Sequence, residues 1–163
     1  TPSNSSAASD VYKRQDRGNV MEKIKLHYTV DDSDFSNMGF VSGDVQEKLK
    51  SKGFSQEVVR KVSTALYQGE INMLIHAGGG KIEIIIDDKC IIMILKDNGP
   101  GIEDIDKALE DGYSTADEHA RSLGFGEGMG FSSMQKYSDE MHIYSEAGIG
   151  TTLIMKVFVN ENK

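Results

Sequence analysis

The hydrophobic positions change their period along the first half of the chain. Residues 24–30 alternate between apolar and polar, which predicts a half-buried strand. Apolar residues then recur at helical spacing through residues 35–49 and 58–77, which predicts two helices. The polar residues 31–34 offer caps for the first helix, and Ser55 offers one for the second. Gly78, Gly79 and Gly80 follow the second helix, and glycine accepts the left-handed geometry that ends helices.

The second half returns to strand-like patterns. Residues 81–86 and 90–96 predict an antiparallel hairpin around the turn formed by Asp87, Asp88 and Lys89. Residues 111–130 are polar, rich in glycine and without a period, which favours a long functional loop. We also expect short helices at residues 103–110 and 131–137, and strands at residues 141–144 and 151–159. The order predicts an α+β fold: a two-layer α/β sandwich in which a mixed, mainly antiparallel sheet carries helices on one face.

The composition narrows the classes of function. A chain of 163 residues with 38% hydrophobic and 27% charged residues suits one globular domain. Its apolar runs are too short to cross a bilayer, so we expect no membrane partner. The net charge of -8 argues against nonspecific binding to nucleic acid. The single cysteine, Cys90, excludes an internal disulfide and favours a buried thiol in a cytoplasmic protein.

Residues 1–20 do not share these patterns. They begin with small polar residues and show no basic start followed by an apolar stretch, so they do not resemble a signal peptide. Residues 5–15 resemble the translation of a common sequencing adapter. We therefore expect residues 1–20 to be a disordered or artefactual extension, and one domain to occupy residues 21–160 from Met21 onward.

Three clusters of residues carry candidate chemistry, and the first lies on the long second helix. Gln68, Asn72 and His76 are spaced by four residues and therefore share one helix face. An asparagine in an otherwise apolar helix must find partners or face a cavity, because burying an unsatisfied amide costs about 1–3 kcal/mol. The alternative is a core asparagine bonded to backbone.

The second cluster, residues 97–101, directly follows an apolar strand. Asp97 can accept a hydrogen bond from an amino group, and the glycines Gly99 and Gly101 let the backbone approach a flat ligand. The alternative is an ordinary strand-to-helix turn, because Asn-Gly and Pro-Gly pairs commonly form turns.

The third cluster places glycine at every second position: Gly124, Gly126, Gly128 and Gly130. Such spacing frees consecutive backbone N–H groups to surround phosphates, and the start of the following helix adds to the attraction. Neither the dinucleotide-binding fingerprint nor a Walker loop is present. The alternative for this cluster is a flexible hinge.

The order of these clusters resembles the N, G1, G2 and G3 boxes of the GHKL (Bergerat-fold) ATPases, with residues 148–152 as the last box. The resemblance covers residues 21–159, almost the whole of the expected domain. Within that superfamily the chain is most similar to the bacterial anti-sigma-factor and switch-protein serine/threonine kinases. Residues 97–105, residues 108–115 and the helix end at Ile75, His76 and Ala77 carry this likeness.

The resemblance implies ATP and Mg²⁺ as cofactors and gives each residue a role. Asn72 would bind the magnesium ion that bridges the phosphates, and Asp97 would accept a hydrogen bond from the adenine amino group. Gly99 and Gly101 would let the base lie close, and the amides of residues 124–130 would close over the phosphates. Thr151 would reach Asp97 or adenine through water, with Thr152 as a competitor for that role.

One position departs from the family. Its kinases place a glutamate four residues before the metal-binding asparagine, where it acts as general base. Here that position is Gln68, which is neutral and cannot accept a proton. Glu70 is near in sequence, but two residues before Asn72 is about 200° around the helix axis. Gln68 can still orient a nucleophile, so losing the base is expected to slow turnover by about 10² to 10⁴-fold rather than abolish it.

These observations leave two main functions open. The first is a serine/threonine protein kinase that transfers the γ-phosphate of ATP to a serine or threonine of a small antagonist-type protein. The expected protein partner is such a substrate or a sigma-factor-like regulator. The second is a nucleotide-gated protein-binding module with weak or no kinase activity, which Gln68 favours. A third interpretation keeps the fold but makes the site degenerate. Because family members often dimerise, a homodimer belongs among the expectations, although the sequence shows no defensible interface.

Overall fold

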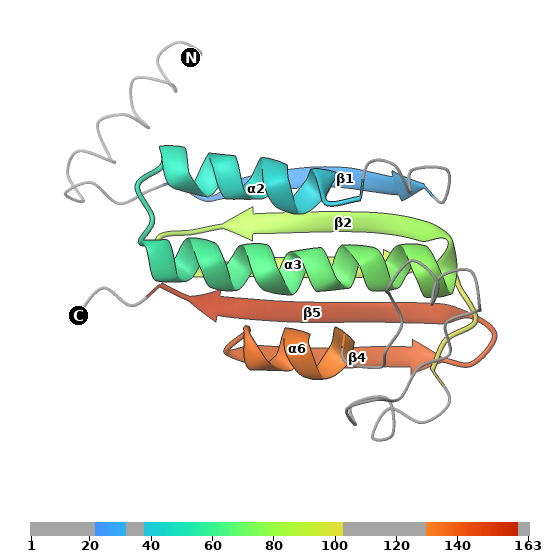
Figure 1. Cartoon of the computed structure of the whole chain (residues 1–163). Coiled ribbons are helices and arrows are strands. Elements are labelled where there is room, and N and C mark those ends of the chain that lie inside the picture. Colours follow the sequence, from blue (N-terminus) through green and yellow to red (C-terminus); the bar gives the residue numbers. More distant parts are fainter. Residues whose placement is uncertain (1–21, 32–37, 103–129, 160–163) are drawn as a thin grey trace, which may run out of the picture.

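A computed structural model describes residues 22–31, 38–102 and 130–159, and these residues form two layers (Figure 1). One layer is an antiparallel five-stranded sheet in the order β1-β2-β3-β5-β4, and the other consists of α2, α3 and α6 on one face of it. The predicted α+β sandwich is therefore confirmed, and every described strand pair is antiparallel. The elements are β1 (Ile24–Asp31), α2 (Phe40–Ser51), α3 (Gln56–Ala77), β2 (Gly79–Ile86), β3 (Cys90–Asp97), α6 (Gly130–Lys136), β4 (Glu140–Glu146) and β5 (Gly150–Phe158).

The long helix α3 lies across the middle of the sheet, and its two ends are as predicted. Ser55 accepts a hydrogen bond from the Val58 backbone N–H, and Gly78 ends the helix at φ 75. Gly79 and Gly80 were also expected to end the helix. They instead begin β2, where Gly79 pairs with Asp31 and Gly80 with Val30 of β1. Glycine is needed there because a Cβ at Gly79 would lie 2.2 Å from the Val30 carbonyl oxygen.

The sheet has one covered face and one open face. Ile82, Ile84 and Ile86 are buried under the helices, and the residues between them point to the other side. The helix side is closed by buried residues of α2, α3 and α6, among them Leu49, Leu66 and Met134, so a single core lies between the layers. Cys90, expected to be fully buried, is only half-buried at the start of β3.

The first helix begins later than predicted. Residues 38 and 39 form a turn and α2 starts at Phe40, so the cap expected from residues 31–34 is wrong for the helix start. Gly39 is the N-cap residue and gives no side-chain hydrogen bond. The backbone N–H groups of Gly39, Val41 and Ser42 instead donate to the carboxylate of Glu70 on α3, at 3.2, 3.3 and 3.2 Å. A distant carboxylate thus satisfies the helix start that the local sequence leaves open.

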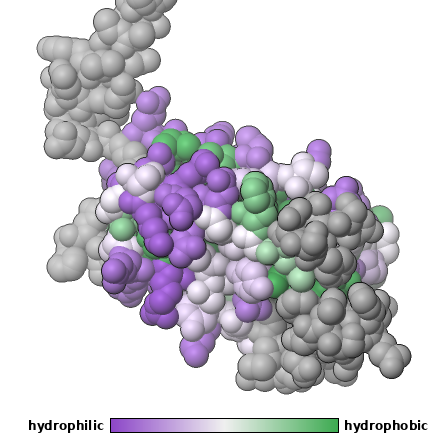
Figure 2. All heavy atoms as spheres, turned by 45° about the horizontal axis from the view of Figure 1, so that its top comes forward, coloured by the Kyte–Doolittle hydropathy of each residue, from purple (hydrophilic) through white to green (hydrophobic). Residues whose placement is uncertain are grey.

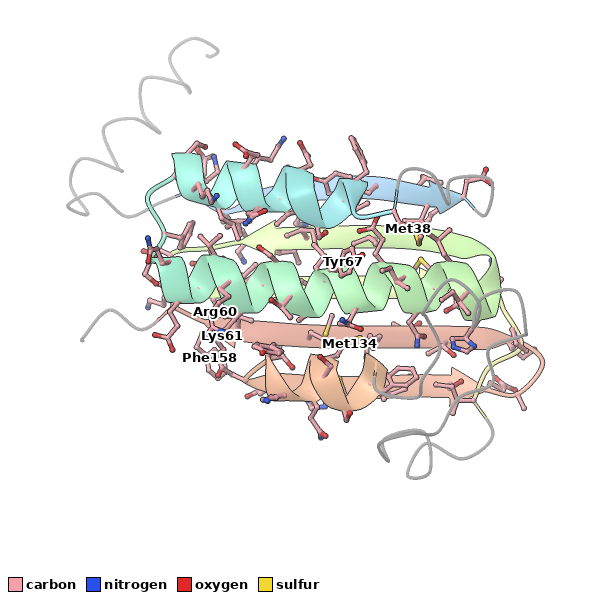
Figure 3. All side chains as sticks on the ribbon, in the orientation of Figure 1. Met38, Arg60, Lys61, Tyr67, Met134 and Phe158 are labelled. Atoms are coloured by element: carbon pink, nitrogen blue, oxygen red, sulfur yellow. The ribbon has the colours of Figure 1, made fainter. Side chains whose placement is uncertain are left out.

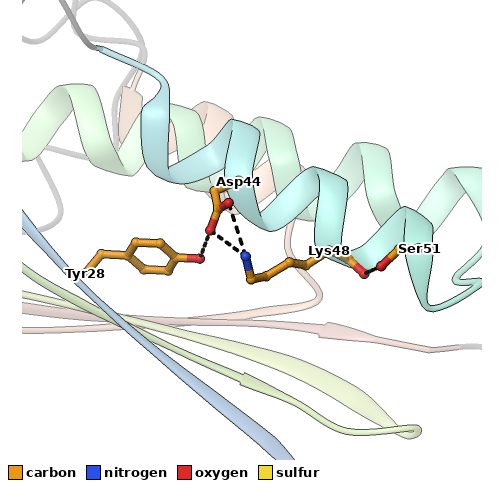
Figure 4. A network of polar contacts seen from close by, with 4 residues as sticks. All are labelled: Tyr28, Asp44, Lys48 and Ser51. Carbon is orange, nitrogen blue, oxygen red and sulfur yellow. Dashed lines mark hydrogen bonds and ion pairs between the residues drawn. The ribbon is translucent and has the colours of Figure 1, made fainter.

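A second polar connection ties α2 to the sheet (Figure 4). The Tyr28 hydroxyl of β1 donates to Asp44 Oδ2 at 2.6 Å, and Lys48 donates to the same carboxylate from one turn further along α2. The hydrogen bond from Tyr28, followed by that from Lys48, lowers the pKa of Asp44. On the outer side of α2 and β1 mostly hydrophilic side chains gather, with smaller hydrophobic patches between them (Figure 2).

The other side of α3 faces α6 and β4. Lys61 forms a 2.7 Å ion pair with Asp139, which precedes β4, and Asp139 also accepts the Phe158 backbone N–H. Although desolvation opposes it, these hydrogen bonds leave the pKa of Asp139 below its usual value. In Figure 3, Lys61 projects from α3 toward β5 and α6, whereas Tyr67 projects toward α2. One flank of α3 therefore faces α2, and the other faces α6 and the residues before β4.

Several predictions lie outside the described residues. They concern the extension at residues 1–20, the helix at residues 103–110 and the loop at residues 111–129. Among the helices that the structure does describe, none combines the length and hydrophobicity needed to span a bilayer.

Candidate functional site

Asp97, the last residue of β3, is held by backbone groups from two segments. Its Oδ1 accepts the Gly99 N–H at 2.9 Å and the Thr151 N–H at 3.2 Å. Within the described part of the chain no hydrogen bond reaches its Oδ2. One carboxylate oxygen therefore fixes the orientation of the side chain, and the other remains able to accept a donor such as an amino group.

The two glycines after Asp97 are required by the packing of the protein itself. A Cβ at Gly99 would lie 2.6 Å from the Ala77 Cβ, at the end of α3. Gly101 has φ +79, and its Cβ would lie 2.4 Å from the Glu146 carbonyl oxygen. The turn therefore contacts both the end of α3 and the end of β4. The close approach of a ligand, predicted from the same glycines, remains a prediction.

Ser145 is a member of this cluster that the sequence patterns did not reveal. Its hydroxyl accepts the Ile102 N–H at 2.7 Å and contacts the Thr151 hydroxyl at 2.9 Å. The Gly148 N–H adds a 2.7 Å bond to the Pro100 carbonyl oxygen. Together these bonds fix the turn after β3 against the β4–β5 hairpin. No local motif marks Ser145, because its partners are 43 and 6 residues away.

The structure separates the two candidate threonines. Thr151 pairs with Asp97 across β3 and β5, and strand alternation places it on the covered face with the buried Leu153. It reaches Asp97 directly through its backbone N–H rather than through its hydroxyl. Thr152 pairs with Lys96 and points to the open face, so it does not compete for the same site.

Gln68 and Asn72 of α3 lie on the flank that faces α6. Lys61, whose ion pair with Asp139 identifies this flank, precedes Gln68 by seven residues, about two helical turns. Gln68 and Asn72 are half-buried, and neither side chain makes a hydrogen bond within residues 22–31, 38–102 and 130–159. The alternative of a core asparagine bonded to backbone is therefore not what the structure shows.

Glu70 points the opposite way, as the helical spacing predicted. Its side chain is 2% exposed and is fully occupied by the start of α2. Burial raises the pKa of this carboxyl, and the three backbone N–H groups oppose that rise. Glu70 is thus a structural carboxylate and is not available to replace the missing base at Gln68.

Several candidate residues lie at one end of the sandwich, where β3 and α3 end and β5 begins (Figure 1). Asp97, Gly99, Gly101 and Thr151 are directly connected there, and His76 lies on the last turn of α3. Gly130 is the first residue of α6, while Gly124, Gly126 and Gly128 lie outside the described residues. The structure thus brings the second cluster together with Thr151 of the predicted last box, and places this turn against Ala77 at the end of the helix that carries the first cluster.

Asn72 fits Mg²⁺ in a limited sense. Its amide oxygen is of the hard type that Mg²⁺ prefers, and no described residue uses it. Groups of three or more His, Cys, Asp or Glu able to hold a metal ion are absent from the described residues. An ion at Asn72 would therefore need oxygen ligands from phosphates and water, as is usual for Mg²⁺ that accompanies a nucleotide.

Comparison with known proteins agrees with this arrangement. The family described as histidine kinase-, DNA gyrase B-, and HSP90-like ATPase matches residues 71–161, more than half of the chain. The chain therefore belongs to this family, the GHKL ATPases. The matched segment starts inside α3, so it includes Asn72 and everything after it but not Gln68.

Three curated relatives of this chain belong to a narrower group than the family match. An anti-sigma F factor of Clostridium kluyveri is 39% identical over 104 residues, 61% of this chain and 70% of the relative. Those of Caldanaerobacter subterraneus and Clostridium perfringens are 34% and 32% identical, and cover 66% and 76% of this chain and 75% and 89% of their own lengths. The resemblance to the anti-sigma-factor branch is therefore confirmed.

Proposed function

We propose that this protein binds ATP with Mg²⁺ and acts as a regulatory serine/threonine kinase on a small protein partner in the cytoplasm. The observation that carries the proposal is Asp97, which is oriented by two backbone N–H groups through one oxygen, while its other oxygen accepts no hydrogen bond from the described residues. An oriented carboxylate with an open oxygen suits recognition of an exocyclic amino group such as that of adenine.

The remaining roles are those that the family resemblance implies for these residues. Asn72 would hold Mg²⁺ against the phosphates, and the backbone amides of residues 124–130 would neutralise further phosphate charge. The partner hydroxyl oxygen would form a bond to the γ-phosphorus as the bond to the β–γ bridging oxygen breaks. Gln68 cannot take the hydroxyl proton, so that proton would pass to a phosphate oxygen or to water. Such a reaction depends mainly on positioning and charge neutralisation.

A nucleotide-gated binding module is the second candidate. It is favoured by one observation: the position of the expected base holds a neutral amide without a partner among the described residues. Such a protein would grip its partner when ATP is bound and would release phosphate slowly or not at all. The anti-sigma F factor relatives support a protein partner in either case, either a sigma-factor-like regulator or an antagonist.

Titration calorimetry with ATP and Mg²⁺ tests the shared part of both candidates. We expect binding by the wild-type chain, and Asp97→Asn should weaken it by about 1–3 kcal/mol because a charge-assisted bond is lost. Thr152→Val, on the open face, is the matched control and should leave the affinity unchanged. If ATP does not bind at millimolar concentration, or Asp97→Asn binds equally well, the proposal fails.

Incubation with labelled ATP and the proteins encoded by neighbouring genes separates the two candidates. Label transferred to a serine or threonine of one of them supports the kinase. A partner that co-purifies only in the presence of ATP, and carries no label, supports the binding module.

A further inference from the structure

The open face of the sheet carries an unusual pair of like charges. Lys81 of β2 and Lys96 of β3 are direct cross-strand partners, and residues in such pairs have their Cβ atoms about 5 Å apart. Both side chains are exposed. Neither forms an ion pair within the described part of the chain. Thr29 and Thr152 continue the same row on the neighbouring strands.

These lysines border a hollow at the end of the sheet. Gly79, two residues before Lys81, adds no side chain, and the exposed Asn98 lies on the far side. The hollow is lined by Thr29, Val30, Asp31, Gly78, Gly79, Gly80, Lys81, Lys96 and Asn98. Its donors are two ammonium groups, a hydroxyl and an amide. Asp31 is the one acidic residue of this lining. Glu83, two residues after Lys81 on β2, is not part of the lining and has its Oε2 4.0 Å from His27 Nε2.

Stability does not explain this pair. Like charges placed directly opposite each other on adjacent strands are destabilising. The whole chain carries 26 acidic residues against 18 basic ones, a net charge of -8, so acidic residues that could pair with lysines are not scarce. A positive pair that forms no ion pair with a described residue, on an acidic protein, instead matches an anion from outside. Because the hollow is open and lies beside Asn98, a bound group would touch the turn that also contains Asp97.

We propose that Lys81 and Lys96 form a docking site for acidic side chains of the protein partner. The site lies on the sheet face opposite α3 and therefore apart from the phosphate positions around Asn72. The proposal rests on the proposed function only in requiring a protein partner. Acidic residues of the partner would be repelled by most of this surface and attracted to this hollow, which would set the orientation of docking.

Fluorescence anisotropy with a labelled hexaglutamate peptide tests the site on the full chain. We expect saturable binding that weakens at about 0.5 M sodium chloride, and about tenfold weaker binding by the double variant Lys81→Gln, Lys96→Gln. The matched control is Lys25→Gln, Lys89→Gln, which removes the same charge from other exposed positions and should change the affinity less than about twofold. Thermal unfolding of the test variant should show no loss of stability, because a repulsive pair has been removed.

Three results would overturn the proposal. They are equal weakening in the two double variants, full displacement of the peptide by inorganic phosphate at the peptide's own dissociation constant, or loss of ATP affinity in the Lys81→Gln, Lys96→Gln variant. Calorimetry with ATP on the same proteins keeps the two proposals apart. If the wild-type chain binds ATP but not the peptide, only the docking proposal is contradicted. If it binds the peptide but not ATP, only the proposed nucleotide function is contradicted.

Discussion

The two flanks of α3 carry side chains of similar polarity in very different surroundings. On the α2 side, Glu70 is buried and accepts three backbone hydrogen bonds. On the α6 side, Gln68 and Asn72 are half-buried and make no hydrogen bond to the described residues. Folding uses the carboxylate of Glu70 on the first flank, whereas on the second flank Gln68 and Asn72 keep amide groups that no described residue binds, which is what a binding site requires.

The largest effect is expected from Gln68→Glu, which places a carboxylate where the resemblance implies a general base. If the α6 flank is a kinase site that lacks only its base, Gln68→Glu should raise the rate of phosphoryl transfer by about 10² to 10⁴-fold. Single-turnover assays with labelled ATP and the partner measure this rate. Tyr67→Phe, on the neighbouring residue but the opposite flank, serves as control. An inert protein that remains inert would place the defect elsewhere and would favour the binding module.

The next effect concerns the α2 flank. Glu70→Ala should lower the free energy of unfolding by about 3 kcal/mol, because three buried backbone N–H groups lose their acceptor. Glu70→Gln keeps an acceptor oxygen and should lose less. Urea denaturation measures both variants. If Glu70→Ala unfolds at the wild-type midpoint, the start of α2 does not depend on this carboxylate.

Asn72→Ala should weaken ATP binding and leave stability almost unchanged, whereas Glu70→Ala should lower stability. Its free energy of unfolding should stay within about 0.5 kcal/mol of the wild type, because no bond is lost and alanine favours helix. Its affinity for ATP in the presence of Mg²⁺ should fall about tenfold, with a smaller change in EDTA. A stability loss as large as that of Glu70→Ala would contradict the contrast between the two flanks.

The smallest effect is the pH dependence that Glu70 contributes. Its pKa is raised in the folded protein, so between its ordinary value of 4.5 and the raised value the folded state binds more protons than the unfolded state. The contribution of Glu70 to stability should therefore fall as pH rises through this window. Urea midpoints of wild type and Glu70→Gln, compared from about pH 4 to pH 7, isolate this slope. Parallel curves would contradict it.

Local patterns predicted much of the fold because many elements depend on their own residues. The alternation over residues 24–30 and the caps at Ser55 and Gly78 appear in the structure as β1 and the two ends of α3. The start of α2 was not predictable from neighbouring residues, because its acceptor, Glu70, lies 28 to 31 residues away along the chain. Strand β2 begins at Gly79 for a similar reason, since its pairing with Asp31 overrides the glycine stop.

The candidate site also contains residues that the sequence predicted and residues that only the structure revealed. Asn72 and Asp97 were predicted from spacing and order along the chain, and both lie within residues 71–161 that the family model matches. Ser145 was not identified, because a single serine in a strand has no distinguishing pattern until the β4–β5 hairpin meets the turn after β3. The choice between Thr151 and Thr152 also required the strand pairing.

By itself the sequence determined the class of this protein, since periodicity selects the elements and the order of its polar and glycine clusters identifies the family. It also shows a neutral Gln68 at the position where the resemblance implies a general base. Only the tertiary structure decided which polar groups are consumed by folding and which stay open, because this depends on contacts between residues far apart in the chain. Three features depend on such contacts: the Glu70 carboxylate that is occupied by the start of α2, the Asp97 oxygen that no described residue binds, and the pairing of Lys81 with Lys96.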